Sequence, residues 1–189
     1  MEAKLVIFSA PSGAGKTTIV RAMLDSFQNL EFSISACSRP KRENEVDGQD
    51  YYFLGVEGFK KKIEEDAFLE WEEVYRDHFY GTLKSEVTRI GAKDHFVIFD
   101  VDAYGGLNIK RQFGSKALAI FIMPPSVEVL EDRLRKRSTD TDENIQKRMD
   151  KARHEISKAD EFDKIIINDE LNDAIDEAKR AVSDFLNNE

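Results

Sequence analysis

Short apolar segments recur along the chain and alternate with longer segments of mixed polarity. The apolar segments cover residues 4–10, 95–102, 117–123 and 164–168. Within residues 16–27, Ile19, Met23 and Phe27 recur at helical spacing, so they share one face of a helix. Short apolar strands separated by helices are typical of a parallel sheet that helices cover on both faces. The pattern therefore predicts an α/β fold with a central parallel sheet.

The second half of the chain contains three more segments with helical character, at residues 126–137, 141–158 and 171–187. Ser126 and Thr141 open the first two segments, and both residue types favour the N-cap position of a helix.

Composition narrows the class of protein. The 189 residues are 41% hydrophobic and 34% charged, as expected for one ordinary globular domain. A net charge of −9 disfavours non-specific nucleic-acid binding, but arginines and lysines cluster in "SRPKR" and "DRLRKR", which favours a small anionic ligand. Cys37 is the only cysteine, so an intrachain disulfide is excluded. We expect a soluble cytoplasmic protein without a signal peptide or membrane segment.

The stretch "APSGAGKT", residues 10–17, matches the phosphate-loop pattern G-x-x-x-x-G-K-[ST] except that Ala10 replaces the first glycine. A predicted strand precedes it and a predicted helix follows it, as the motif requires. Small residues let backbone amides converge on phosphate oxygens at the helix N-terminus. Lys16 can bridge the outer phosphates, and the Thr17 hydroxyl can bind Mg²⁺. The alternative, a glycine-rich turn with an exposed lysine, explains this spacing less well. The residues expected to hold a nucleoside triphosphate are Ser12, Gly13, Ala14, Gly15, Lys16, Thr17 and Thr18.

Residues 33–82 break the alternation of strands and helices. The segment is rich in Tyr, Phe, Asp and Gly and contains strand-like and turn-like pieces. We interpret it as an insertion between the first helix and the rest of the sheet. An insertion beside a phosphate loop is a natural place for a second substrate.

The ordered motifs "APSGAGKTT", "FSISACSRPKRENEVDGQDYYF", "FLEWEEVY", "FYGT", "FDVD", "PPSVEVLEDRLRKRSTDTDENIQKRM" and "IIIND" resemble guanylate kinase along nearly the whole chain. The resemblance implies transfer of a phosphoryl group from ATP to GMP or dGMP, with Mg²⁺ as cofactor. It also implies a P-loop NTPase-type parallel sheet flanked by helices, within a single domain. The implied regions are a core (1–32, 83–125 and 151–189), a β-rich GMP-binding insertion (33–82) and a helical lid (126–150).

The resemblance also assigns residues to the GMP site. Guanine offers N1–H and N2–H₂ donors, and the carboxylate of Glu70 can accept from both. Arg39 and Arg42 carry planar guanidinium groups that suit the GMP phosphate. The remaining positions supply hydroxyl or carboxylate groups around the nucleotide: Ser35, Glu45, Tyr51, Tyr80, Thr82 and Asp100. Asp100 and Asp102 follow an apolar strand, so both should face the ligand crevice.

By the same resemblance, Arg133, Arg137 and Arg148 are lid arginines that act with Lys16 on the transferring phosphoryl group, whose charge they neutralise. Ser138 stands where the family more often has glycine, which puts the geometry of the lid turn in question. Cys37 and Ser38 likewise replace threonines. The GMP phosphate is already an anionic nucleophile, so no protein base is required.

Two other functions are weighed against phosphorylation of GMP: a binding module without activity and a kinase for another nucleotide. A guanylate-kinase-like module that binds phosphopeptides without turnover would typically lack a working phosphate loop, whereas Gly13, Gly15, Lys16 and Thr17 are intact here. A kinase for AMP or UMP would place Glu70 against the unprotonated N1 of adenine, which is repulsive. We therefore expect ATP and GMP or dGMP as small-molecule partners, no nucleic acid or membrane partner, and a monomer or small homo-oligomer.

Overall fold

A five-stranded parallel sheet forms the centre of the computed structural model, which describes residues 4–137 and 141–188. In spatial order its strands are β2 (Leu30–Phe32), β7 (Phe96–Asp100), β1 (Leu5–Ser9), β8 (Ala117–Met123) and β9 (Lys164–Ile167). All neighbouring strands pair in parallel. β1 lies in the middle and is buried along its whole length. The turn that follows it therefore emerges at the centre of the carboxyl edge.

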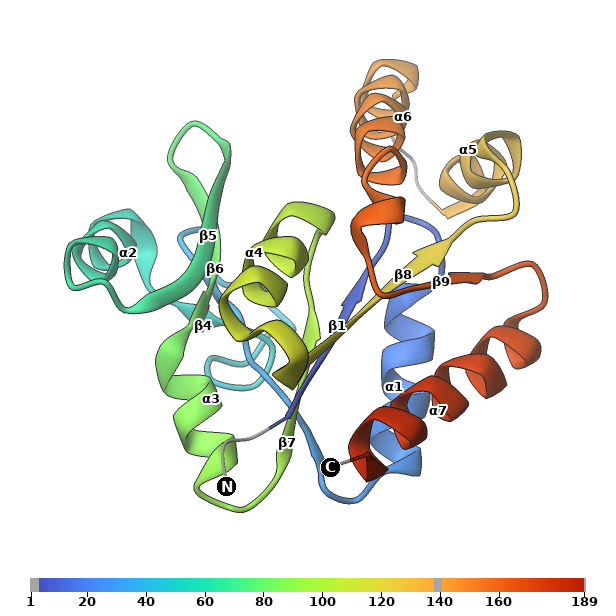
Figure 1. Ribbon diagram of the computed structural model, residues 1–189. Helices are drawn as coiled ribbons and strands as arrows, with labels where there is room; N and C mark the ends of the chain where they lie inside the picture. The colour runs from blue at the N-terminus through green and yellow to red at the C-terminus, as the bar shows by residue number, and fades with distance from the viewer. Residues whose placement is uncertain (1–3, 138–140, 189) are drawn as a thin grey trace.

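Helices cover both faces of this sheet (Figure 1). On one face lie α1 (Lys16–Ser26) and α7 (Leu171–Asn187), and on the other lie α3 (Lys84–Gly91) and α4 (Ala103–Phe113). Successive side chains of β1 alternate between the two cores: Val6 and Phe8 pack with α1 and α7, whereas Leu5 and Ile7 pack with α3 and α4. This explains why the strand is apolar throughout, and it confirms the predicted α/β sheet.

A second sheet of four strands lies almost wholly within the predicted insertion. In spatial order its strands are β4 (Tyr52–Phe53), β3 (Ala36–Cys37), β6 (His78–Leu83) and β5 (Phe68–Tyr75). Helix α2 (Gly55–Glu64) packs on it, and α4 of the main fold contacts β5. The ring of Phe59 stacks on Phe68 and Phe79, with centroid distances of 4.4 and 5.4 Å, so this sheet has its own small core.

Two further helices, α5 (Val127–Arg137) and α6 (Asp142–Ile156), lie between β8 and β9 in the chain. Ser126 Oγ accepts a hydrogen bond from the Val129 amide at 3.2 Å, and Thr141 Oγ1 accepts one from the Asn144 amide at 3.4 Å, as the predicted N-caps require. The Ser138 turn lies outside the described residues. Hairpin β5–β6 and helix α6 stand on opposite sides of the carboxyl end of β1 (Figure 1). Within the described part of the chain, every helix is too short or too polar to cross a membrane.

Candidate active site

The turn between β1 and α1 depends on two glycines. Gly13 and Gly15 have φ angles of 94° and 95°, which side chains with a Cβ rarely adopt. A Cβ on Gly15 would also lie 2.3 Å from Nδ2 of Asn168. Ala10 has no such requirement, because positive φ among the described non-glycine residues is confined to three aspartates elsewhere. The alanine at the first motif position is therefore compatible with the backbone.

The N-terminus of α1 points backbone donors toward the same space. Gly15 is the N-cap residue and has no side chain with which to accept from the first amides of the helix. The first turn contains no acidic residue that would compete for those donors. Such a helix start, with its positive dipole end, favours an anion.

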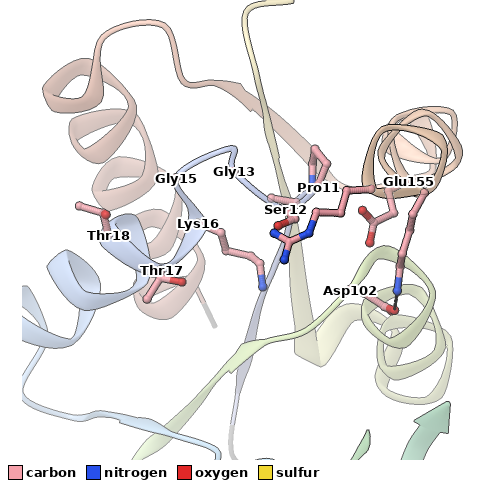
Figure 2. Close-up of a pocket in the computed structure, with 12 residues that line it drawn as sticks. Pro11, Ser12, Gly13, Gly15, Lys16, Thr17, Thr18, Asp102 and Glu155 are labelled. Atoms are coloured by element: carbon pink, nitrogen blue, oxygen red, sulfur yellow. Dashed lines mark hydrogen bonds and ion pairs between the residues drawn. The ribbon is translucent and has the colours of Figure 1, made fainter. Parts of the chain in front are cut away.

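A cavity of about 400 Å³, here called the loop cavity, opens above this turn. Most of the residues predicted to hold the triphosphate line this cavity: Ser12, Gly13, Gly15, Lys16, Thr17 and Thr18. Ala14 is buried behind the turn, where its carbonyl oxygen accepts a 2.7 Å hydrogen bond from Asn168 Nδ2. Across the cavity from Lys16 lie Asp102 and the α6 residue Glu155 (Figure 2). The cavity is therefore walled by the turn on one side and by α6 on the other.

A second cavity of about 260 Å³, the sheet cavity, lies between the two sheets. Five of the residues predicted to bind GMP line this cavity: Ser35, Tyr51, Glu70, Tyr80 and Asp100. Lys16 lines this cavity as well as the loop cavity, and its ammonium forms an ion pair with Asp100. Burial lowers the pKa of Lys16 to about 8, whereas the carboxylates of Glu155 and Asp102 act in the opposite direction.

Glu70 lies in the sheet cavity with one oxygen already engaged. Thr82 Oγ1 donates to Glu70 Oε1 at 2.6 Å, and Thr82 is itself buried. Burial raises the pKa of Glu70 to about 7, the Thr82 hydrogen bond lowers it, and the charge of Asp102 raises it further. The second oxygen, Oε2, lies next to Gly105 at the start of α4.

Arg39 and Glu45 form a bidentate pair beside Tyr51, which lines the sheet cavity. Both Arg39–Glu45 hydrogen bonds measure 2.6 Å, and the guanidinium carbon lies 5.1 Å from the ring centroid of Tyr51. The hydrogen bond from Arg39 holds the pKa of Glu45 down to about 2. Arg42 has an exposed side chain, and its backbone amide donates to Glu45 at 2.8 Å. Glu45 thus organises Arg39 and its loop, but none of Arg39, Arg42 and Glu45 lines the sheet cavity.

The predicted lid arginines lie on different sides of the phosphate loop. Arg148 lines the loop cavity. Arg133 lines a third cavity of about 330 Å³, where its Nη2 donates to the Asn168 carbonyl oxygen at 3.2 Å. Leu171 also lines this third cavity and is partly exposed. The side chain of Arg137 lies outside the described residues.

Six further polar residues line these cavities although the sequence did not assign them to a site: Glu72, Lys136, Lys151, Glu155, Asn168 and Asp169. Lys151 and Glu155 follow Arg148 at spacings of three and seven, which places all three on one face of α6. Burial raises the pKa of Glu155 to about 7, against the charge of Lys151. The sequence contains a signal for some of these residues. Lys151 and Glu155 are at helical spacing from Arg148, and Asn168 is the polar residue that directly follows an apolar strand.

The donors for a divalent cation are few. Among the described residues, no group of three or more His, Cys, Asp or Glu side chains is arranged to hold a metal ion. Thr17 is exposed at the loop cavity. Mg²⁺ keeps several waters and binds phosphate oxygens with only one or two protein ligands, so this donor set fits Mg²⁺ bound together with a triphosphate.

Comparison with known proteins gives one consistent family. The sequence pattern of the family "Guanylate kinase" matches residues 2–185. The chain is 51% identical over 184 residues to the guanylate kinase of Porphyromonas gingivalis, covering 97% of this chain and 98% of the relative. It is 49% identical to that of Bacteroides thetaiotaomicron over 189 residues, covering 100% and 93%. The crystal structure of guanylate kinase from Anaplasma phagocytophilum superimposes with a TM-score of 0.73 at 25% identity, covering 96% of this chain and 85% of that one.

Proposed function

The chain belongs to the guanylate kinase family, and we propose that its loop cavity holds the triphosphate of ATP while its sheet cavity holds GMP or dGMP. The γ-phosphoryl group then passes from ATP to the GMP phosphate, giving ADP and GDP. The observation that carries this assignment is the position of Lys16, which lines both cavities. A cation at their junction can contact the phosphoryl group before and after transfer.

On the acceptor side, Glu70 is the group that distinguishes the base. Its ionised carboxylate accepts from the N1–H and N2–H₂ groups of guanine, and the Thr82 hydroxyl fixes its orientation. Arg39, preorganised by Glu45, supplies a guanidinium group for the GMP phosphate. Tyr51 and Tyr80 add phenolic donors, and Ser35 adds a hydroxyl group. Adenine would meet Glu70 with a lone pair rather than a donor, so AMP is a poor acceptor.

On the donor side, backbone amides of residues 13–18 surround the phosphates. Lys16 exchanges its ion pair with Asp100 for phosphate oxygens, which favours its charged form. Arg148 faces the same cavity, and Arg133 and Arg137 complete the set of cations that neutralise charge on the transferring oxygens. We place the adenosine group in the third cavity, between Arg133 and Leu171, because that cavity continues from Gly13 and Thr18 of the loop.

Mg²⁺ is the cofactor that the donor set suits, with Thr17 as its protein ligand. Thr17 would hold the ion, which would supply positive charge that draws negative charge from the phosphate oxygens. Asp100 is close enough to the loop to orient the ammonium group of Lys16. We also place the protein in the cytoplasm, where ATP and GMP are available and a free Cys37 stays reduced. A monomer or small homo-oligomer suffices, because both cavities are formed within one chain.

The direct test is release of ADP in a coupled assay, with GMP, dGMP, AMP, UMP and CMP as acceptors and a reaction without acceptor as control. We expect GMP and dGMP to be phosphorylated in preference to the others. Lys16→Met should remain folded and lose turnover by a factor on the order of 10² or more, because a strong transition-state contact disappears. Lys61→Met, an exposed lysine on α2, is the matched control and should turn over normally. Near-normal turnover by Lys16→Met, or no turnover by the wild type, would contradict the assignment.

A further inference from the structure

Lys151 of α6 joins three elements that meet between the two substrate cavities. Its ammonium lies 3.4 Å from Oδ2 of Asp102 and 3.9 Å from Oε2 of Glu72. Glu72 belongs to β5, and Asp102 is the N-cap of α4. We call these three residues the Lys151 cluster; the dashed line that ends on Asp102 in Figure 2 marks one of its contacts.

The cluster spans both cavities. Lys151 lines the loop cavity, Glu72 lines the sheet cavity and Asp102 lines both. Asp102 is held in place by the rigid start of α4, where the Gly105 amide donates to its Oδ1 at 2.9 Å. The other two members come from opposite walls, one from α6 and one from the second sheet. The cluster is therefore a direct charged link between the wall of the ATP site and the wall of the GMP site.

The charge of Lys151 favours the ionised form of both carboxyl groups. Glu72 is hydrogen-bonded to Asp102, which together with burial raises the pKa of Glu72 to about 7. Burial alone would also raise the pKa of Asp102, but the hydrogen bonds from Glu72 and the Gly105 amide and the charge of Lys151 lower it. Adjacent carboxylates repel each other when both are ionised, and a nearby cation relieves that repulsion. Lys151 contacts both carboxyl groups.

Solvent exposure sets the strength of the attraction between Lys151 and the two carboxylates. In the empty protein the side chains of Lys151 and Glu72 are 44% and 42% exposed, so water screens their attraction and the pair contributes little to stability. A nucleotide in the sheet cavity displaces water from Glu72 and Asp102. The lower local dielectric then strengthens their attraction to Lys151.

We propose that Lys151 is a positioning residue that couples the two substrate sites, drawing α6 onto the loop cavity when the sheet cavity is filled. The inference rests on the proposed assignment of GMP to the sheet cavity and ATP to the loop cavity. Arg148 lies one turn before Lys151 on the same face of α6, so movement of Lys151 toward Asp102 carries Arg148 toward the phosphates. Because coupling between two ligands is reciprocal, a bound ATP analogue tightens GMP binding by the same factor.

The test is the dissociation constant of GMP, measured by calorimetry with and without a saturating non-hydrolysable ATP analogue and Mg²⁺. We expect the analogue to tighten GMP binding to the wild type, and Lys151→Met to reduce this coupling factor by about fivefold or more. GMP should also bind the otherwise empty variant somewhat more weakly, because the attraction that GMP strengthens is missing. Thermal unfolding of the empty variant should stay close to wild type, because the exposed pair contributes little to stability. Lys151→Arg should restore coupling. Lys147→Met, one turn earlier on α6 and paired with Glu143, is the matched control and should behave as wild type.

A second experiment combines Glu72→Gln with Lys151→Met. If Glu72 acts through Lys151, the protein with both substitutions should lose no more coupling than the protein with Lys151→Met alone. Unchanged coupling in Lys151→Met, equal loss in Lys147→Met, additive losses in the double variant, or absence of coupling in the wild type would each overturn the proposal. Failure of the proposed function is a separate result, because it would appear as a wild type that does not phosphorylate GMP.

Discussion

Glu70, the carboxyl group that we propose reads the guanine base, should also make GMP binding respond to pH. Burial and the nearby charge of Asp102 favour its protonated form, whereas the Thr82 hydroxyl favours the carboxylate. The resulting pKa of about 7 lies far above its ordinary value of 4.5. Only the ionised form accepts from both guanine donors, so protonation competes with recognition.

GMP affinity should therefore rise with pH through neutrality. Below the pKa of about 7 the empty site must lose a proton before GMP binds, which weakens binding by up to about tenfold for each pH unit. Calorimetric titration between about pH 5.5 and pH 8 tests this, with Glu70→Gln as the matched variant. The second ionisation of the GMP phosphate affects both proteins equally, so the ratio of their affinities isolates Glu70. Parallel pH profiles for the two proteins would refute the expectation.

Gly105 gives Glu70 the space that it occupies. A Cβ on Gly105 would lie 2.8 Å from Glu70 Oε2, the far end of a flexible side chain. Gly105→Ala should therefore move Glu70 without unfolding the protein. Loss of one charge-assisted hydrogen bond costs ~1.5–3 kcal/mol, so KM for GMP should rise on the order of 10- to 100-fold. KM for ATP should change little. Gly58→Ala, in helix α2 with space for a Cβ, is the control, and an unchanged GMP KM in Gly105→Ala would exclude the steric argument.

At the scale of elements, apolar patterning predicted the strands and helices that pack through continuous or periodic hydrophobic faces. It did not predict β2, because this three-residue strand contains Glu31 and has no apolar run. It also missed α4, whose Gly105 and Gly106 disfavour a helix. Those glycines are required by tertiary contacts: a Cβ on Gly106 would lie 2.4 Å from Ser9 Oγ. Helix α2 was missed for a similar reason, since it begins at Gly55 with a positive φ.

The same limit applies to the site. The phosphate loop was recognisable because its residues are contiguous in sequence, whereas most positions of the sheet cavity lie far apart, from Ser35 to Asp100, and were assigned through the ordered motifs of the family resemblance. Asn168 shows what motifs cannot supply. Its side chain donates to the Ala14 carbonyl at 2.7 Å and its own carbonyl accepts from Arg133 at 3.2 Å. It therefore joins β9, the phosphate loop and α5, and only the packing of these elements reveals that contact.

Asn168→Ala should disturb the ATP side more than the GMP side. The change leaves the buried Ala14 carbonyl without this donor, which costs about 1–3 kcal/mol of unfolding free energy. Because the loop loses this support, whereas the backbone carbonyl that accepts from Arg133 remains, KM for ATP should rise while KM for GMP stays near the wild-type value. Denaturant unfolding and steady-state kinetics measure the two effects. Asn187→Ala, an exposed asparagine near the end of α7, is the control; equal changes in both KM values would contradict a role specific to the loop.

At the scale of the whole molecule, the acidic side chains that line the proposed substrate cavities make the stability of the fold depend on pH. Glu70, Glu72 and Glu155 each have a pKa raised to about 7, from an ordinary value of 4.5. Between these values the folded protein binds more protons than the unfolded chain. Glu31 has a pKa lowered to about 2, so its stabilising contribution is complete above its unfolded value and stays constant at higher pH. Lys16, with a pKa of about 8, changes charge only above this range.

The free energy of unfolding of the empty protein should therefore fall as pH rises from about 5 to about 7. The sign follows from the carboxyl groups: raising the pH forces buried carboxyls to ionise in the folded state, whereas the unfolded chain has already released those protons. Thermal unfolding at about pH 5.5 and about pH 7.5 tests the slope, and Glu155→Gln should reduce it because one of the three groups no longer titrates. GMP and a non-hydrolysable ATP analogue with Mg²⁺ bind only the folded state, so they should offset the loss at the higher pH. A midpoint that rises with pH in the empty wild type, or an unchanged slope in Glu155→Gln, would show that these carboxylates do not set the stability of the site.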